Sequence, residues 1–218
     1  MLPIDTPIHV GRSLWGPFHR LCLQAQEGGR SHTIRSGPFA AEALADGGLR
    51  LDTTLHVPTA TGAVRATLRL RRDASGAVVE TGLEAPAEGD PAAAAALDAM
   101  RAGLSTPAGG FLERQALGTG DLFTLGSTGG VPLLCRVLGQ ARHLGRAVLV
   151  ARCAGSQPVT EAGWSALLSA EGHVAVDVET GMVILSALAC RLSGEAAPQA
   201  EIRLQAWVTL RRDMSEAA

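Results

Sequence analysis

The chain has 218 residues, 46% of them hydrophobic and 18% charged, and it carries a formal net charge of -2. All 19 basic residues are Arg, and the sequence contains no Lys, Tyr or Asn. The absence of Lys excludes Schiff-base chemistry, a pyridoxal-phosphate anchor and a Walker-type phosphate loop, and the small net charge argues against nucleic-acid binding.

The beginning of the sequence does not resemble a targeting segment. Residues 1–10 lack the basic start and the apolar core of a secretory signal peptide. No run of the sequence approaches the roughly 18 apolar residues that a membrane-spanning helix needs. These features predict a cytoplasmic protein if Met1 is the native start, and a mature region numbered from a Met if it is not.

Residues 1–86 are expected to form a first antiparallel β-meander. The clearest strand is at residues 63–72, where apolar and polar side chains alternate as on a strand with one buried face. One-sided strands of this kind are typical of antiparallel sheets with one face in water. The positions expected to face inward are Val64, Ala66, Leu68 and Leu70.

One helix is predicted at residues 91–104, within a connector at 87–130. Asp90 suits the N-cap, and Pro91 suits the first helical position because no N–H donor is needed there. We expect this helix to pack on the concave face of the sheet. Its apolar side consists of Ala93, Leu97, Met100 and Leu104. The Gly-rich residues 118–130 that follow lack the preceding strand and the Lys of a phosphate loop, and they are expected to be a flexible linker.

Residues 131–218 are expected to form a second meander related to the first. The strand at 202–211 has the alternation of residues 63–72, and both strands run into Leu-Arg-Arg-Asp. We predict an internal repeat, with chance similarity between amphipathic strands as the alternative. The inward positions are Ile202, Leu204, Ala206, Val208 and Leu210, and Trp207 faces outward. The segments that correspond in order are 19–28 with 146–155, 31–36 with 164–170, 49–57 with 182–192, and 63–72 with 202–211.

No residue cluster in the sequence has the spacing of a known catalytic or metal site. The four cysteines are scattered without a C-x-x-C pair, so no metal site is predicted and buried thiols are favoured, with one disulfide as an alternative in an oxidising compartment. A histidine beside a carboxylate is the one arrangement that would support acid–base chemistry. The cysteines are Cys22, Cys135, Cys153 and Cys190. The candidate acid–base residues are His32, His56 and His173 with Asp52 and Asp177.

The second half resembles uncharacterised bacterial envelope proteins and lipoproteins. The likeness is carried by Val-Leu-Gly at 137–139, Gly-Arg-Ala-Val at 145–148, an Asp-x-x-Thr-Gly hairpin at 177–181 and Gly-Asp-Leu-Phe at 120–123. It implies a two-lobed curved β-sheet, a half-barrel around a cleft, that carries lipids or lipoproteins in the periplasm or envelope. The chain departs from the pattern because a signal peptide and a lipid-anchoring Cys are missing near its start.

Together these observations predict a mainly β protein with two curved meanders and one helix on the concave face. The first functional hypothesis is a non-catalytic binding or carrier protein for an apolar or lipid-like ligand in the bacterial envelope. The alternatives are a small β-barrel enzyme using His and Asp, and an assembly subunit that uses edge strands and Trp207. No cofactor, metal, catalytic residue or nucleic-acid partner is predicted, and the oligomeric state is left open. The residues expected to line the ligand site are Leu97, Met100, Leu104, Leu68, Leu70, Leu204 and Val208.

Overall fold

A computed structural model of the chain describes residues 1–14, 16–59, 62–75, 78–84, 111–125, 131–161, 164–194 and 200–210. These residues form fourteen β-strands and no helix, and every strand pairing is antiparallel, which confirms the prediction of a mainly β protein. The helix predicted at 91–104, with Leu97, Met100 and Leu104, lies outside the described residues. The described part contains no helix with the length and hydrophobicity needed to cross a lipid bilayer.

The strands follow one another through the whole of the described chain. In the first half they are β1 (Ile8–Val10), β2 (Phe18–Glu27), β3 (Arg30–Ser36), β4 (Ala40–Ala43), β5 (Leu49–Thr59), β6 (Gly62–Arg72) and β7 (Val78–Glu84). In the second half they are β8 (Gln115–Leu117), β9 (Leu122–Leu125), β10 (Leu133–His143), β11 (Arg146–Glu161), β12 (Trp164–Asp177), β13 (Val183–Ser193) and β14 (Ala200–Leu210).

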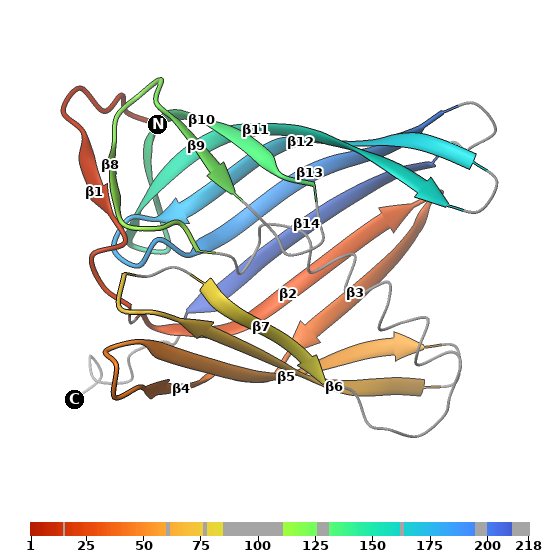
Figure 1. Cartoon of the computed structure of the whole chain (residues 1–218), viewed down its shortest axis with the longest axis horizontal. Coiled ribbons are helices and arrows are strands. Elements are labelled where there is room, and N and C mark those ends of the chain that lie inside the picture. Colours follow the sequence, from red (N-terminus) through yellow and green to blue (C-terminus); the bar gives the residue numbers. More distant parts are fainter. Residues whose placement is uncertain are drawn as a thin grey trace.

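Twelve of the strands belong to one large sheet. Its order is β7-β6-β5-β3-β2-β14-β13-β12-β11-β10-β9, with β4 beside β5, while β1 and β8 form a separate pair. No described strand joins β7 to β9, so the sheet is open. Figure 1 shows that it is strongly curved, with β5, β6 and β7 on one limb and β9 to β13 on the other.

The alternation seen in the sequence determines which side chains enter the core. On β6, Ala66, Leu68 and Leu70 are buried while Arg65 is exposed, as predicted. We call the face that carries Leu68 and Val208 the inner face of the sheet. On β14, Ala206 and Val208 are buried on this face, and Ile202 and Leu204 are partly buried. The side chains of Val64 and Leu210 lie outside what the structure describes.

The two halves of the chain meet inside the sheet rather than as separate lobes. Strand β14 pairs with β2 along nearly its whole length, from Ile202 opposite Glu27 to Leu210 opposite Phe18. The predicted connector at 87–130 also contributes strands, because β8 pairs with β1 and β9 pairs with β10. Phe123 and Leu125 of β9 are buried, so alternate residues of this segment pack in the core.

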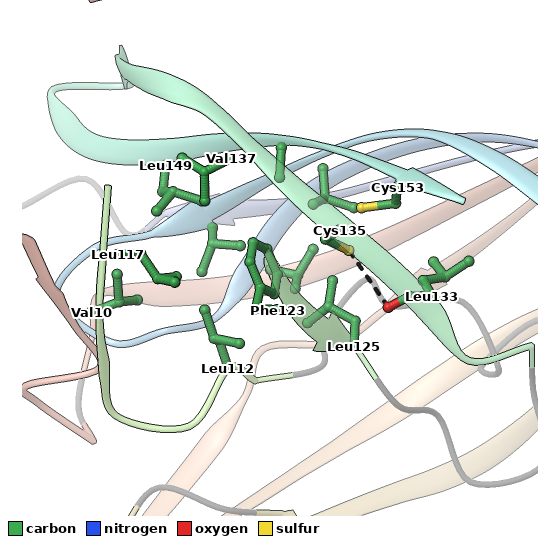
Figure 2. Close-up of a cluster of buried hydrophobic side chains, with 14 of the residues drawn as sticks. Val10, Leu112, Leu117, Phe123, Leu125, Leu133, Cys135, Val137, Leu149 and Cys153 are labelled. Carbon is green, nitrogen blue, oxygen red and sulfur yellow. Dashed lines mark hydrogen bonds between the residues drawn. The ribbon is translucent and has the colours of Figure 1, made fainter. Parts of the chain in front are cut away.

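The core consists of two packed clusters of buried side chains. The first lies mainly among β2, β5, β6 and β14 and includes Leu55, Leu68 and Val208. The second lies among β8 to β13 and includes Phe123 and Leu149. Figure 2 shows this second cluster, to which Val10 and Leu112 contribute from outside the large sheet.

Candidate functional site

The turn between β12 and β13 contains the most highly connected polar group of the described structure, Asp177. Its side chain is only 1% exposed and binds Arg146 through two contacts, Nε to Oδ1 at 2.6 Å and Nη2 to Oδ2 at 2.9 Å. Oδ2 also accepts hydrogen bonds from the backbone N–H and the hydroxyl of Thr180, at 2.9 and 2.7 Å. Both carboxylate oxygens are therefore engaged in holding the Asp-x-x-Thr-Gly turn.

The ionisation of this pair follows from its surroundings. Burial alone would raise the pKa of Asp177, but the hydrogen bonds from Arg146 and Thr180 outweigh it and hold that pKa below its usual value. The hydrogen bond to Asp177 in turn raises the pKa of Arg146. Asp177 therefore stays ionised at neutral pH and is not suited to act as a general acid or base.

A second arginine, which is fully buried, ties the other limb of the sheet to this turn. Arg72, at the end of β6, is fully buried, and its Nη2 donates to the carbonyl oxygen of Thr180 at 3.1 Å. Its guanidinium carbon lies 3.6 Å from the centroid of the Phe111 ring. Burial lowers the pKa of Arg72 to about 10, so it remains charged at neutral pH. We call Arg72, Arg146, Asp177 and Thr180 the polar clasp, and the end of the sheet that it closes the proximal end.

The inner face is fully packed near the polar clasp and more exposed toward the opposite, distal end. On β12, Val174 and Val176 are at most 1% exposed, whereas Leu168 further along the same face is only partly buried. On β14, Val208 is buried and Leu204 is partly buried. We call the partly buried apolar side chains on this part of β12, β13 and β14 the distal inner patch; they are Leu168, Cys190, Leu192, Ile202 and Leu204.

The distal inner patch is continuous, because its residues lie opposite one another on the paired strands β12, β13 and β14. Leu168 lies opposite Leu192, Cys190 opposite Ile202, and Leu204 opposite the buried Leu188. Directly opposed side chains of antiparallel strands contact one another, so these residues form one apolar surface.

One buried polar atom lies on the packed part of the inner face, opposite the buried Val174 and Ala206. Ser186 is on the inner face of β13, two residues before Leu188, and is 2% exposed. Its hydroxyl has no hydrogen-bond partner among the residues that the structure describes. A buried hydroxyl without a partner is costly, which makes Ser186 a candidate contact for a polar group that enters from outside the chain.

The residues predicted to line a ligand site are only partly brought together. Leu68, Leu70 and Val208 belong to the first core cluster and are at most 9% exposed, so they pack against protein. Leu204 lies in the distal inner patch, where it contacts the second cluster.

The histidines do not converge in the described structure. His56 and His173 are exposed on β5 and β12, and the side chain of His32 lies outside the description. Asp52 is paired with Arg50 and Arg69, and Asp177 is held in the polar clasp. Across the described ranges, no group of three His, Cys, Asp or Glu side chains has metal-binding geometry.

Sequence reasoning missed the roles of Arg72, Arg146 and Ser186. Every second residue of β6 faces inward, and Arg72 is the next such position after residues 66, 68 and 70. This alternation was the signal in the sequence from which its burial could have been predicted. Its contact with Thr180, 108 residues away, has no counterpart in the sequence pattern. Searches against protein-family models, curated proteins and solved structures give no match for this chain.

Proposed function

We propose that this chain is a non-catalytic binding or carrier protein that holds an elongated apolar molecule, bearing one hydrogen-bonding group, against the distal inner patch. A fatty acid or a fatty alcohol has this chemistry. The ligand class is the one predicted from the sequence, but the proposed site excludes Leu68, Leu70 and Val208, which pack against protein. A place in the bacterial envelope, as the sequence resemblance implies, belongs to the same proposal.

The change of burial along single strands is the observation that carries the proposal. Val208 and Leu204 lie on the same face of β14, yet the first is 1% exposed and the second is partly exposed. Apolar side chains gain roughly 25 cal/mol for each Å² removed from water, so a partly exposed inner surface favours an apolar occupant. The polar clasp closes the proximal end, which leaves the distal end as the route of access.

Ser186 supports the choice of a ligand with a polar group. Its hydroxyl is buried on the face that carries the distal inner patch, next along β13 to Leu188, which lies opposite Leu204. A ligand hydroxyl or carboxylate at this position would provide the missing partner and remove a desolvation cost of about 1–3 kcal/mol.

We include the internal repeat in the proposal. Along the sheet, β11-β12-β13-β14 is followed by β2-β3-β5-β6, so the segments matched in the sequence occur in the same order in each half. Two related meanders placed in succession would build a curved sheet long enough to enclose a ligand.

The experiment is a titration of the full chain with a dansyl-labelled fatty acid, followed by fluorescence. We expect Leu204→Glu to weaken binding at least about tenfold, because a carboxylate at this position opposes an apolar ligand. Gln205→Glu, on the exposed face one residue along β14, is the matched control and should bind like the wild type.

A third variant separates the ligand's polar group from its apolar body. Ser186→Ala should weaken binding of the fatty acid while leaving the urea midpoint of the free protein unchanged or higher, since it removes a hydroxyl that has no described partner. Absence of binding by the wild type, or equal binding by Leu204→Glu and Gln205→Glu, would overturn the proposal.

One observation favours assembly as a second candidate function. Val150, Ala175, Leu185, Trp207 and Cys22 are register partners in one row across five strands of the outer face. In this row Ala175 and Cys22 are buried, and the apolar side chains of Val150, Leu185 and Trp207 are partly exposed. Light scattering would support this function if the wild type is oligomeric and Trp207→Gln is monomeric, and a monomeric wild type at high concentration would exclude it.

A further inference from the structure

Two of the four cysteines lie directly opposite each other on neighbouring strands. Cys135 of β10 and Cys153 of β11 are register partners, and both side chains are fully buried on the inner face. Figure 2 shows them in the second core cluster. All four cysteines are free thiols in this structure, and Cys135 makes a weak contact from Sγ to the carbonyl oxygen of Leu133 at 3.8 Å.

The hydrogen bonds of the surrounding backbone show whether Cys135 and Cys153 occupy a hydrogen-bonded or a non-hydrogen-bonded position of the antiparallel pair. The N–H of Val137 donates to Asp121, and its carbonyl accepts from Gly120, so Val137 directs its backbone groups away from β11. Cys135, two residues earlier on the same strand, has the same orientation.

On the neighbouring strand, Ala147 accepts a hydrogen bond from Val178 and therefore faces β12. The pairing of β11 with β12 is regular from Val148 onward, so Cys153 also directs its backbone groups toward β12. Cys135 and Cys153 thus oppose each other at a non-hydrogen-bonded position.

Such positions bring two side chains closest together. The Cα atoms of a non-hydrogen-bonded antiparallel pair are about 4.5 Å apart, and disulfides span Cα distances of about 4.4–6.8 Å. We propose that Cys135 and Cys153 form a cross-strand disulfide that joins β10 to β11 when the chain folds with access to a small-molecule disulfide.

The reaction is thiol–disulfide exchange with oxidised glutathione. One cysteine loses its proton and attacks a sulfur of the glutathione disulfide, which forms a mixed disulfide and releases one glutathione thiolate. The second cysteine, also deprotonated, attacks the protein sulfur of that mixed disulfide and displaces the second glutathione. In total, two protein thiols are oxidised to one disulfide and one glutathione disulfide is reduced to two thiols.

The exchange must take place before the core closes. The hydrogen bond with Cys153, together with burial, raises the pKa of the Cys135 thiol in the folded protein, so little thiolate is present. The chain should therefore be oxidised efficiently during refolding and slowly once folded.

The other two cysteines provide an internal control. Cys22 lies opposite Arg35 and Trp207, and Cys190 lies opposite Ala170 and Ile202, so neither has a cysteine as register partner. The double variant Cys22→Ser/Cys190→Ser should retain the cross-link, whereas Cys135→Ser and Cys153→Ser should each abolish it.

The test is to refold the full chain from denaturant into a buffer of reduced and oxidised glutathione. Remaining thiols are blocked with N-ethylmaleimide under denaturing conditions and counted by intact mass. We expect two blocked thiols in the wild type, none in Cys22→Ser/Cys190→Ser, and a mass lower by two hydrogens in each. Trypsin would place Cys153 and Cys190 in one peptide, since no Arg separates them, so the link is mapped in the double variant.

Three outcomes would overturn the proposal. These are four blocked thiols in the refolded wild type, a cross-link that persists in Cys135→Ser or in Cys153→Ser, and two blocked thiols in the double variant. If Cys135→Ser does not fold, the number of blocked thiols in the double variant still shows whether Cys135 and Cys153 are linked. Its oxidised form should unfold at a higher urea concentration than its reduced form, and an equal or lower midpoint would show that the link does not fit the native register.

Discussion

Asp177 and Glu179 both bind the Arg146 guanidinium, but they differ in burial. Asp177 is 1% exposed and Glu179 is 61% exposed, and the contact from Arg146 Nη2 to Glu179 Oε2 is 3.0 Å. We predict that Asp177→Ala lowers the free energy of unfolding by about 3 kcal/mol, because it removes the buried partner of a partly buried ion pair together with the hydrogen bonds that Thr180 donates to it. Glu179→Ala should change it by less than about 1 kcal/mol. Urea denaturation of both variants checks this, and equal losses would contradict the role given to Asp177.

The same carboxylate should make stability depend on pH. The pKa of Asp177 is lowered in the folded protein, so its contribution is fully present above the unfolded pKa of about 3.9 and is lost as the pH falls through the folded value. Asp177→Asn does not titrate at this position. The difference in urea midpoint between wild type and Asp177→Asn should therefore be constant from pH 7 to about 5 and shrink below about pH 4. A difference that stays constant into acid would contradict this assignment.

Individual positions were predictable only where side-chain alternation decides the outcome. Leu68 and Val208 were expected to face inward and are buried, because a strand with one wet face leaves no other choice. The partner of Arg72 could not be predicted, since the contact with Thr180 depends on the curvature that brings two limbs together. Ser186 was missed because a serine on a strand gives no sign that its hydroxyl is buried without a partner in the described part of the chain.

Gly181 shows how the turn between β12 and β13 limits substitution. Its φ is +72°, and a Cβ added there would collide with the carbonyl oxygen of Leu112. Gly145, in the turn between β10 and β11, has a similar φ of +80° and nothing within 4 Å of an added Cβ. Gly145→Ala should cost about 1 kcal/mol from its left-handed conformation alone.

Gly181→Ala should cost about 1–3 kcal/mol more than Gly145→Ala, because overpacking against Leu112 adds to the same backbone strain. Thermal and urea unfolding of the two variants give the comparison. Equal destabilisation would mean that the chain near Leu112 moves away without cost. The Asp-x-x-Thr-Gly segment would then be an ordinary hairpin turn rather than part of a closed end.

At the level of strands, the β class and the alternation of buried and exposed side chains could be predicted from the sequence. The pairing of distant strands could not. The segment containing β9 was expected to be a flexible linker because it is rich in Gly, yet Phe123 and Leu125 pack in the second core cluster. The contact of β14 with β2 joins the last described strand to one of the first. The alternation of apolar and polar residues does not show which strand pairs with which, because many strands of this chain have the same alternation.

The molecule as a whole combines a closed end with a less covered one. Arg72 and Asp177 hold the two limbs together through Thr180, and the first core cluster fills the space beside them. The distal inner patch lies on the same curved face and keeps partly exposed apolar side chains, and the buried Ser186 hydroxyl on that face has no partner among the described residues. This contrast between the two ends is the physical basis for proposing a carrier of an apolar molecule.

Native mass spectrometry of freshly purified protein, with analysis of its organic-solvent extract, tests the proposed carrier function most directly. We predict a bound apolar molecule with a hydroxyl or carboxylate group, retained by Gln205→Glu and lost from Leu204→Glu. The contradicting result is the bare mass of the chain in every sample, with no uptake of added fatty acid by the wild type.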